Sequence, residues 1–313
     1  MRKTVALLLL NWNTPEHTSN CIASVLKYCN TDNYDIIVTD NGSTDGSLLV
    51  LKQRFPDLIF IDNQENLGFA EGNNRALLYS IANNYTYSLV MNTDTLVDED
   101  IVSKLSSHLK KHPTAAAVQP AIYWMHKPTE IWNGEGRFNK ILGKTVSDTT
   151  TPTTTDQAFY IEAEWLTGCC MMIRNQALQK IGLFNSLFFL YYEDVDLSYR
   201  LRKEGYNLHY LPWCKMYHEA GISAKVSAPK KEGQLSPIIH YYISRNHWWF
   251  IRQYGSPVFF PINLLYNGVY YLALWVYFII RRRSTKASFL LKGLREGLFT
   301  PKKVIWSKNN LHQ

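Results

Sequence analysis

Short apolar runs alternate with amphipathic stretches along the first part of the chain. The apolar runs are uninterrupted and of strand length, which is typical of parallel strands buried on both faces. They are Val5–Leu10, Tyr34–Thr39, Leu58–Ile61 and Tyr87–Met91. The segments with helical periodicity are Thr18–Tyr28, Gly46–Phe55 and Ala70–Asn83. This alternation predicts an α/β domain with a mostly parallel central sheet that is flanked by helices.

A polar cluster follows each of these predicted strands. The clusters are Asn11–Thr14, Asp40–Asp45, Asn63–Gly68 and Asn92–Asp94. In an open α/β sheet the ligand crevice lies beyond the carboxyl ends of the strands. We therefore expect the four clusters to meet at one edge of the sheet and to form a binding site there.

Two of these clusters have residues suited to a nucleotide. In Asp40–Asp45, a carboxylate and an amide can bind a base or ribose, and the N–H groups at the next helix start favour an anion. A turn capped by Asp and Ser explains this cluster equally well. Asp94 could hold a divalent cation that bridges a diphosphate. Alternatively, it caps a helix that begins near Asp98.

Two later segments could also carry chemistry. Tyr191–Leu197 has three acidic residues at the start of an amphipathic stretch, and repulsion between close carboxylates can raise the pKa of one and make it a general base. Alternatively, these acids only complement a helix dipole. His218 opens a loop, His218–Ser223, after the strand-like run Asn207–Leu211. A metal or phosphate contact there is the alternative to a packing role.

Several other classes of protein are disfavoured. The sequence has no Gly-x-Gly-x-x-Gly, no Walker A Gly-Lys-Ser/Thr and no Gly-x-Ser-x-Gly. Its 46% apolar share is too high for a disordered chain. The five cysteines stand at no regular spacing, and Cys169 and Cys170 lie in an apolar run. We therefore expect reduced core thiols and a cytoplasmic location rather than disulfides or a zinc site.

The order of these motifs resembles glycosyltransferase family 2, which consists of inverting enzymes with the GT-A fold. The closest resemblance is to its rhamnosyltransferase-like branch, which assembles bacterial cell-surface polysaccharides. The matching motifs are Asn11-Trp12-Asn13, Asp40–Asp45, Asn66–Asn74, Asn92-Thr93-Asp94, Trp165–Gly168, Phe189–Asp196 and His218–Ser223. The resemblance implies a catalytic domain over residues 1–225, with a nucleotide-sugar half (1–115) and an acceptor half (116–225), followed by a helical, basic, membrane-associated region over 226–313.

The resemblance also implies residue roles. The nucleotide-sugar positions would be Asn11, Asn13, Asp40, Gly42, Ser43, Asn66, Gly68, Asn92 and Asp94. Asn92 stands at the first acid of a DxD-type motif, so Asp94 alone would supply its carboxylate and would bind Mg²⁺ or Mn²⁺ with His218. Asp194 would be the general base with Glu193 beside it. The acceptor side would hold Trp165, Tyr192 and Arg245.

Charge is distributed unevenly along the chain. Residues 1–214 carry a net −5 and residues 215–313 a net +12, which together give the overall +7. A basic C-terminal third favours a polyanionic partner, either nucleic acid or an anionic membrane. The basic residues flank the uncharged run Val258–Ile280 and form no groove with exposed stacking rings. We therefore expect a membrane partner and no nucleic acid.

The Val258–Ile280 run is long enough to span a bilayer. Asn263, Asn267 and Tyr270 share one helical face, which favours a helix in the membrane interface or a monotopic insertion. A single span and a buried helix are the alternatives. The nearby cations expected to meet lipid headgroups are Lys286, Lys292, Arg295, Lys302 and Lys303. The predicted location is the cytoplasmic face of the bacterial inner membrane.

Together these features predict an inverting glycosyltransferase that moves rhamnose or a similar sugar from a nucleoside-diphosphate donor to a hydroxyl of a polyprenyl-linked or other lipid-linked glycan. A nucleotidyltransferase would need a basic, Gly-rich loop, which Leu7–Pro15 lacks. An inactive sugar-nucleotide-binding relative is disfavoured because Asp94, Asp194 and His218 are all present. The donor, the acceptor linkage and the oligomeric state stay open.

Overall fold

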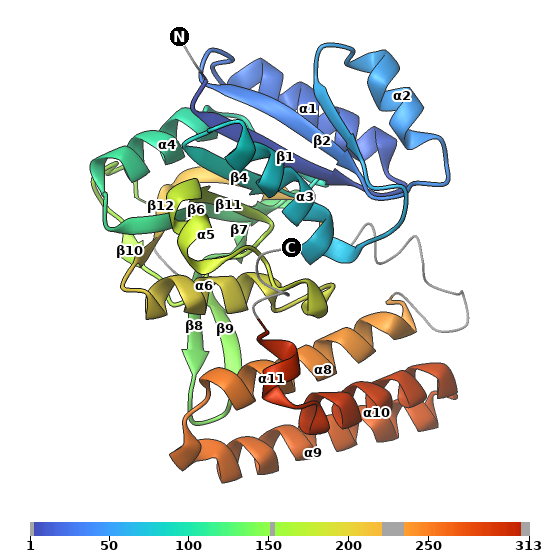
Figure 1. The fold of residues 1–313 in the computed structure, drawn as a ribbon. Coiled ribbons are helices and arrows are strands. Elements are labelled where there is room, and N and C mark those ends of the chain that lie inside the picture. The colour runs from blue at the N-terminus through green and yellow to red at the C-terminus, as the bar shows by residue number, and fades with distance from the viewer. Residues whose placement is uncertain (1–2, 151–153, 221–234, 308–313) are drawn as a thin grey trace.

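The computed structural model describes residues 3–150, 154–220 and 235–307. At its centre is a ten-stranded sheet with the order β10-β12-β6-β11-β4-β1-β2-β3, in which β5 pairs with β12 and β7 with β6 (Figure 1). Its strands are β1 (Val5–Asn11), β2 (Tyr34–Asp40), β3 (Ile59–Asp62), β4 (Tyr87–Met91), β5 (Thr95–Leu96), β6 (Ala115–Trp124), β7 (Lys127–Asn133), β10 (Ile161–Glu162), β11 (Cys170–Arg174) and β12 (Asn207–His218). A separate hairpin is formed by β8 (Glu135–Asn139) and β9 (Lys144–Asp148).

The N-terminal half of the sheet is parallel, as the apolar runs predict. β1 pairs in parallel with β2 and β4, and β2 pairs in parallel with β3. The bounds of these four strands lie within one residue of the predicted ones. Helix α1 (Pro15–Tyr28) begins three residues earlier than predicted. Proline is well suited to the first turn of a helix, where its missing N–H is not needed.

The other half of the sheet is mixed rather than mostly parallel. β11 runs antiparallel to both β4 and β6, whereas β12 runs parallel to β6. The strand predicted at Asn207–Leu211 continues to His218, after an irregularity between Leu211 and Lys215. Pro212 lies in this interruption, and proline cannot donate to the ladder. Once pairing resumes, β12 carries His218 to the edge of the sheet where β1, β2 and β4 also end.

Helices cover both faces of the central sheet. They are α1, α2 (Ser47–Arg54) and α4 (Ile101–Lys111) on one face, and α3 (Gly68–Ala82), α5 (Asn175–Ile181) and α6 (Glu193–Lys203) on the other. Successive residues of β1 point to opposite faces. Leu7 therefore packs with the first group and Leu8 with the second. All five cysteines are buried free thiols, as expected.

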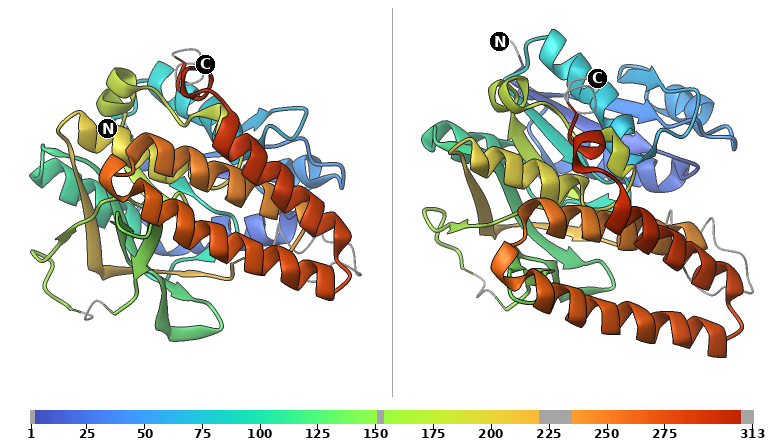
Figure 2. Two further views of the ribbon diagram at one scale, coloured as in Figure 1. Left: turned by 90° about the horizontal axis from the view of Figure 1, so that it is seen from below. Right: turned by 60° about the horizontal axis from the view of Figure 1, so that its bottom comes forward.

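The C-terminal helices form a further layer beneath this body. They are α8 (Pro237–Tyr254), α9 (Phe260–Ile280), α10 (Ser284–Phe299) and α11 (Lys302–Ile305), with a short 3-10 turn at Pro257–Phe259. A second 3-10 turn, Ser186–Phe188, lies between α5 and α6. Figures 1 and 2 show α8, α9 and α10 side by side, with α9 farthest from the central sheet. The layer packs on α6 and on the β8–β9 hairpin through an apolar cluster that includes Phe138, Val195 and Trp248. The domain boundary predicted at residue 225 lies outside the described residues.

Helix α9 binds the protein body through the face that was predicted to meet the membrane interface. Asn263 and Asn267 are buried, and their side-chain amides donate to the carbonyl oxygens of Lys140, Ile141 and Leu142 in the β8–β9 turn. Tyr270 shares this side of the helix at i+7 from Asn263, as predicted, but it is 55% exposed while the next residue, Tyr271, is buried. The protein body therefore covers this face at Asn263 and Asn267 and leaves it exposed at Tyr270.

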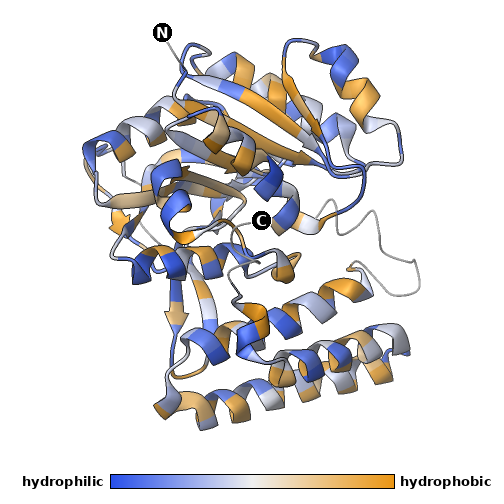
Figure 3. Ribbon diagram, in the orientation of Figure 1, coloured by the Kyte–Doolittle hydropathy of each residue, from blue (hydrophilic) through white to orange (hydrophobic). Residues whose placement is uncertain are grey.

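The opposite side of α9 is apolar and exposed. Among the described residues, Pro257–Ile280 is the one helical stretch long and apolar enough to cross a membrane. Only 22% of its most apolar part is buried, and Figure 3 shows apolar residues along its length. Lys286 is buried on α10, so this residue does not join the exposed cations as predicted.

Candidate active site

The first two polar clusters meet at the carboxyl edge of the sheet. Parallel register places Asn11 of β1 beside Asp40 of β2. The Asn11 side-chain amide donates to Asp40 Oδ1 (2.9 Å) and to Ser43 Oγ (3.1 Å), and the Ser43 backbone N–H donates to Asp40 Oδ2 (2.8 Å). Asn13 joins the same network, because its Oδ1 accepts the Thr44 N–H. Four predicted positions are thus held together around a buried carboxylate.

Asn41, the amide of the Asp40–Asp45 cluster, was given no separate site role and organises the third cluster. Its Nδ2 donates to Asn66 Oδ1 (3.1 Å), and its Oδ1 accepts from Asn63 Nδ2 (3.0 Å) and from the Leu67 N–H (3.2 Å). Gly68 follows with a φ of +77°, and a Cβ there would lie 2.6 Å from Phe189. Only glycine fits this close approach. Asn41 could have been identified from its place inside the Asp40–Asp45 motif.

Asp94 and His218 are paired although they are 124 residues apart. Antiparallel pairing of β5 with β12 sets Thr95 opposite His218. His218 Nε2 lies 3.0 Å from Asp94 Oδ1, and the Glu219 N–H donates to the Asp94 carbonyl oxygen. The described part of the chain offers no hydrogen-bond partner to the buried His218 Nδ1. The rest of the predicted loop, Gly221–Ser223, lies outside the described residues.

The helix-cap alternative for Asp94 is wrong. Helix α4 is capped by Asp100, whose carboxylate accepts the Ser103 N–H at 2.9 Å. Asp94 therefore has no role in starting that helix. The Asp94 carboxylate and the His218 imidazole face each other. As metal ligands, these two groups suit a divalent cation such as Mn²⁺.

Glu193 and Asp194 form the first turn of α6. Asp194 accepts two backbone N–H groups, from Gly168 at Oδ2 and from Val195 at Oδ1, both at 2.8 Å. Glu193 is buried, and its Oε2 has no partner among the residues that the structure describes. The third acid, Asp196, is structural. It pairs with Arg200 at 2.8 Å.

The environment separates the pKa values of Glu193 and Asp194. Burial, together with the nearby charge of Asp194, raises the pKa of Glu193 well above its usual range. Burial also raises the pKa of Asp194, but the N–H groups of Gly168 and Val195 counteract this rise. Glu193 is therefore the carboxyl group that stays neutral more readily, and Asp194 is the one suited to ionise and accept a proton.

The segment Gly168–Cys169 connects Asp194 with the end of β4. The Asn92 N–H donates to the Cys169 carbonyl oxygen (2.8 Å), while the Gly168 N–H donates to Asp194. Burial is the main cause that raises the pKa of the Cys169 thiol, and the charges of Asp94 and Asp194 add to the rise. The segment thus bonds to Asp194 on one side and to the Asn92–Asp94 motif on the other.

The residues predicted on the acceptor side lie behind the site. Trp165 is buried, and its indole N–H donates to the Arg137 carbonyl oxygen. Tyr192 stacks on the His247 ring. The buried guanidinium of Arg245 donates to the carbonyl oxygens of Leu187 and Phe188. These contacts make Arg245 a support of the loop that precedes Glu193 and join Trp165 to the β8–β9 hairpin, so neither is an exposed wall.

Asn246, the neighbour of Arg245, is a second positioning residue. Its fully buried side-chain Nδ2 donates to the carbonyl oxygens of Phe188, Leu190 and Tyr191 at 2.8–2.9 Å. Phe189, Tyr191 and Tyr192 all have positive φ angles, which are strained for residues with a side chain. Helix α8 thus holds a strained loop directly before the two carboxylates.

Comparisons with known proteins agree with this arrangement. A family model described as "Glycosyl transferase family 2" matches residues 9–182. An N-acetylglucosaminyl-diphospho-decaprenol L-rhamnosyltransferase of Mycobacterium tuberculosis is 24% identical over 80% of this chain and 87% of its own length. A poly-beta-1,6-N-acetyl-D-glucosamine synthase of Staphylococcus aureus is 23% identical over 88% of this chain and 63% of its own length.

Two solved structures share the fold. A mannosyltransferase from Pyrobaculum calidifontis, in complex with GDP-Man and Mn²⁺, has a TM-score of 0.53 and 15% identity, and the match covers 99% of this chain and 84% of that one. GalNAc-T7 with UDP, GalNAc and Mn²⁺ has a TM-score of 0.62 and 13% identity, with 80% and 48% covered. At these identities the likeness shows the fold alone.

Replacing Glu193 with glutamine tests its buried, neutral state. Because the pKa of Glu193 is higher in the folded chain than in the unfolded one, unfolding releases a proton between the two values, and stability falls as pH rises through that window. The loss is about 1.4 kcal/mol for each pH unit inside it. The Glu193→Gln protein does not suffer this loss. The difference between its Tm and that of the wild type, measured by thermal unfolding, should therefore increase from pH 4 to pH 7.

The matched control is Glu130→Gln, which changes an exposed carboxyl group. Its Tm should follow the wild-type curve throughout this pH range. A Glu193→Gln protein that loses stability increasingly as pH rises would contradict the neutral assignment.

Proposed function

The chain belongs to glycosyltransferase family 2, and from this premise we propose that it transfers rhamnose or a similar sugar from a nucleoside-diphosphate donor to a hydroxyl of a lipid-linked cell-surface glycan, with inversion at the anomeric carbon. The observation that carries the proposal is that the segment Gly168–Cys169 bonds to Asp194 through Gly168 and to the Asn92–Asp94 motif through Cys169. One carboxylate is thereby available for the donor diphosphate and the other for the acceptor.

The donor nucleoside is assigned to the network around Asp40. This network lies at the carboxyl edge of parallel strands, the usual place for a nucleotide in an α/β sheet. Asn11, Asp40 and Ser43 hold one another through hydrogen bonds, so their polar atoms are fixed before a ligand arrives. Asn66 and Gly68 border the network through Asn41.

Asp94 and His218 would hold a divalent cation near the donor diphosphate. The carboxylate and imidazole ligands fit Mn²⁺, and a carboxylate with water ligands suffices for Mg²⁺. When bound, such a cation supplies charge that stabilises the leaving nucleoside diphosphate. The neighbouring solved structures hold UDP or GDP-Man with Mn²⁺, which supports this reading.

Asp194 would act as the general base. Its carboxylate accepts the proton of the acceptor hydroxyl while that oxygen attacks the anomeric carbon. The bond between this carbon and the diphosphate oxygen breaks on the opposite face. A single displacement of this kind inverts the configuration and needs only one base. Glu193, kept neutral by burial, would orient the acceptor without competing for its proton.

A lipid-linked acceptor requires that the enzyme reach a membrane, and α9 offers a surface for this. Leu265, Val269 and Leu272 are at least 60% exposed and lie on one helical face at i, i+4 and i+7. Arg281 and Arg282 are exposed at the end of the helix, where anionic headgroups would attract them. We assign this face to the cytoplasmic surface of an anionic bacterial membrane.

The packing of α9 supports a helix lying in the interface rather than one spanning the bilayer. Its opposite face contacts the protein body along its length, from Asn263 to Phe278. Helix α10 packs beside it and carries Lys292, Arg295 and Glu296. A span would therefore bring these charges into the hydrocarbon core, which is costly.

A screen of nucleotide sugars tests the enzymatic proposal. Purified protein is incubated with dTDP-rhamnose, UDP-hexoses, UDP-galactofuranose or GDP-sugars in Mg²⁺ or Mn²⁺, and the released nucleoside diphosphate is measured. We expect turnover of at least one donor and a loss of about 100-fold or more in Asp94→Ala. Asp98→Ala, which removes an exposed acid four residues away, is the control and should stay active. No turnover of any donor with either cation would refute the proposal.

Vesicle flotation tests the membrane assignment. The triple variant Leu265→Gln/Val269→Gln/Leu272→Gln loses apolar contacts of roughly 1 kcal/mol or more at each position. We expect its binding to vesicles of phosphatidylglycerol and phosphatidylcholine to fall at least about tenfold. Leu49→Gln on α2, which is 63% exposed, is the control and should bind like wild type. Equal binding by the triple variant and wild type would rule out α9 as the docking surface.

A further inference from the structure

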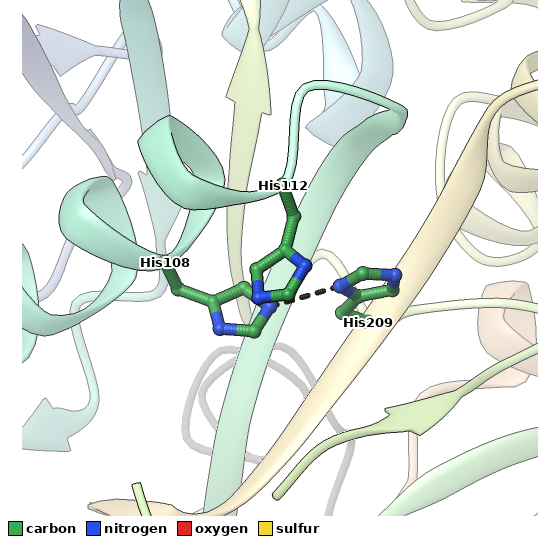
Figure 4. Close-up of side chains that lie close together, drawn as sticks. All are labelled: His108, His112 and His209. Carbon is green, nitrogen blue, oxygen red and sulfur yellow. Dashed lines mark hydrogen bonds between the residues drawn. The ribbon is translucent and has the colours of Figure 1, made fainter. Parts of the chain in front are cut away.

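Three histidines gather at the end of the sheet opposite to the candidate active site. His108 and His112 lie one turn apart at the C-terminal end of α4, and His209 is near the start of β12. Figure 4 shows the three rings turned toward one another. One ligand nitrogen from each lies within 4.8 Å of the others, and His108 Nε2 is 2.8 Å from His209 Nδ1.

The surroundings of these rings suit a bound cation. His108 and His209 are buried. His209 faces the other two rings through its Nδ1, and in the described part of the chain no carboxylate pairs with any of the three rings.

We propose that His108, His112 and His209 form a binding site for Zn²⁺ or a similar divalent transition-metal ion. Imidazole favours such ions over Mg²⁺ or Ca²⁺. Two histidines four residues apart on a helix, with a third ligand from elsewhere, are a common zinc arrangement. Three imidazoles fill three of the four positions that zinc prefers and leave one for water.

The rings must reorient to bind zinc, because those of His108 and His112 are stacked. With Zn–N bonds of about 2.0–2.1 Å, tetrahedral ligands stand about 3.4 Å apart. The His108–His209 pair at 2.8 Å would open slightly, and the more distant nitrogens, now up to 4.8 Å apart, would approach. Rotation of the half-exposed His112 side chain can supply most of this change.

This site is separate from the Asp94–His218 pair and has a structural role. His209 and His218 stand nine residues apart on β12, which is about 30 Å in an extended strand. A metal at the three histidines would connect α4 with β12, and Tyr160, which stacks on His209, extends the contact to the start of β10. It would thus stabilise the strand whose far end carries His218.

Metal binding by the whole, tag-free protein tests this proposal. An Asp94→Ala background removes the candidate donor-metal site, and the chelator-stripped protein is then loaded with Zn²⁺ and analysed for bound metal and for Tm. We expect one zinc per chain and, at about 100 times the dissociation constant, a rise in Tm of roughly 5 °C. Added Co²⁺ should give the visible absorption of a four-coordinate ion.

Two variants decide whether these histidines bind the metal. In the same background His112→Ala should lose the zinc, the Co²⁺ absorption and the rise in Tm, whereas His126→Ala, which changes an exposed histidine outside the group, should keep all three. His112→Cys, which supplies a thiolate ligand, should restore binding. Absence of zinc binding in the Asp94→Ala background, or full binding by His112→Ala, would overturn the proposal and leave a stacked, metal-free histidine cluster.

Discussion

The backbone of Gly168 and Cys169 holds the two halves of the site together. It accepts a hydrogen bond from the end of β4 and donates one to Asp194 at the start of α6. A side chain at position 168 would crowd the Phe69 ring and approach Asp194. The segment lies at the carboxyl edge because β11, which follows it, runs opposite to its neighbours. One reversed strand thus joins the proposed base, Asp194, to the motif that carries the proposed donor-side carboxylate, Asp94.

The C-terminal helices connect the proposed membrane surface with Glu193 and Asp194, the proposed catalytic carboxylates. On α8, Arg245 and Asn246 hold the carbonyl groups of the strained loop before Glu193. On α9, one face docks on the β8–β9 turn while the other presents apolar side chains outward. Because both helices belong to one packed layer, a chain docked through α9 would hold its base at a fixed distance from the lipid surface.

The sequence allowed the parallel half of the fold to be predicted because buried strands and their polar ends are local patterns. The Asp94–His218 pair was predicted only through the family resemblance, and the Asp194–Gly168 contact was not predicted. These contacts depend on β5–β12 pairing and on the reversal of β11, which no local pattern shows. Helical periodicity grouped Asn263 and Asn267 but could not show that the β8–β9 turn covers them. The three histidines meet because β12 passes α4, a contact that no local pattern encodes.

The central claim is that Asp194 removes the proton from the acceptor while other residues bind the donor. It is tested most directly by measuring transfer and donor affinity together in Asp194→Asn, with the donor that the wild type turns over and titration calorimetry for its binding. The account predicts that transfer falls by about 10²–10⁴-fold while the dissociation constant of the donor stays within about threefold of wild type. Retained transfer, or a loss of donor binding as large as the loss of transfer, would contradict it.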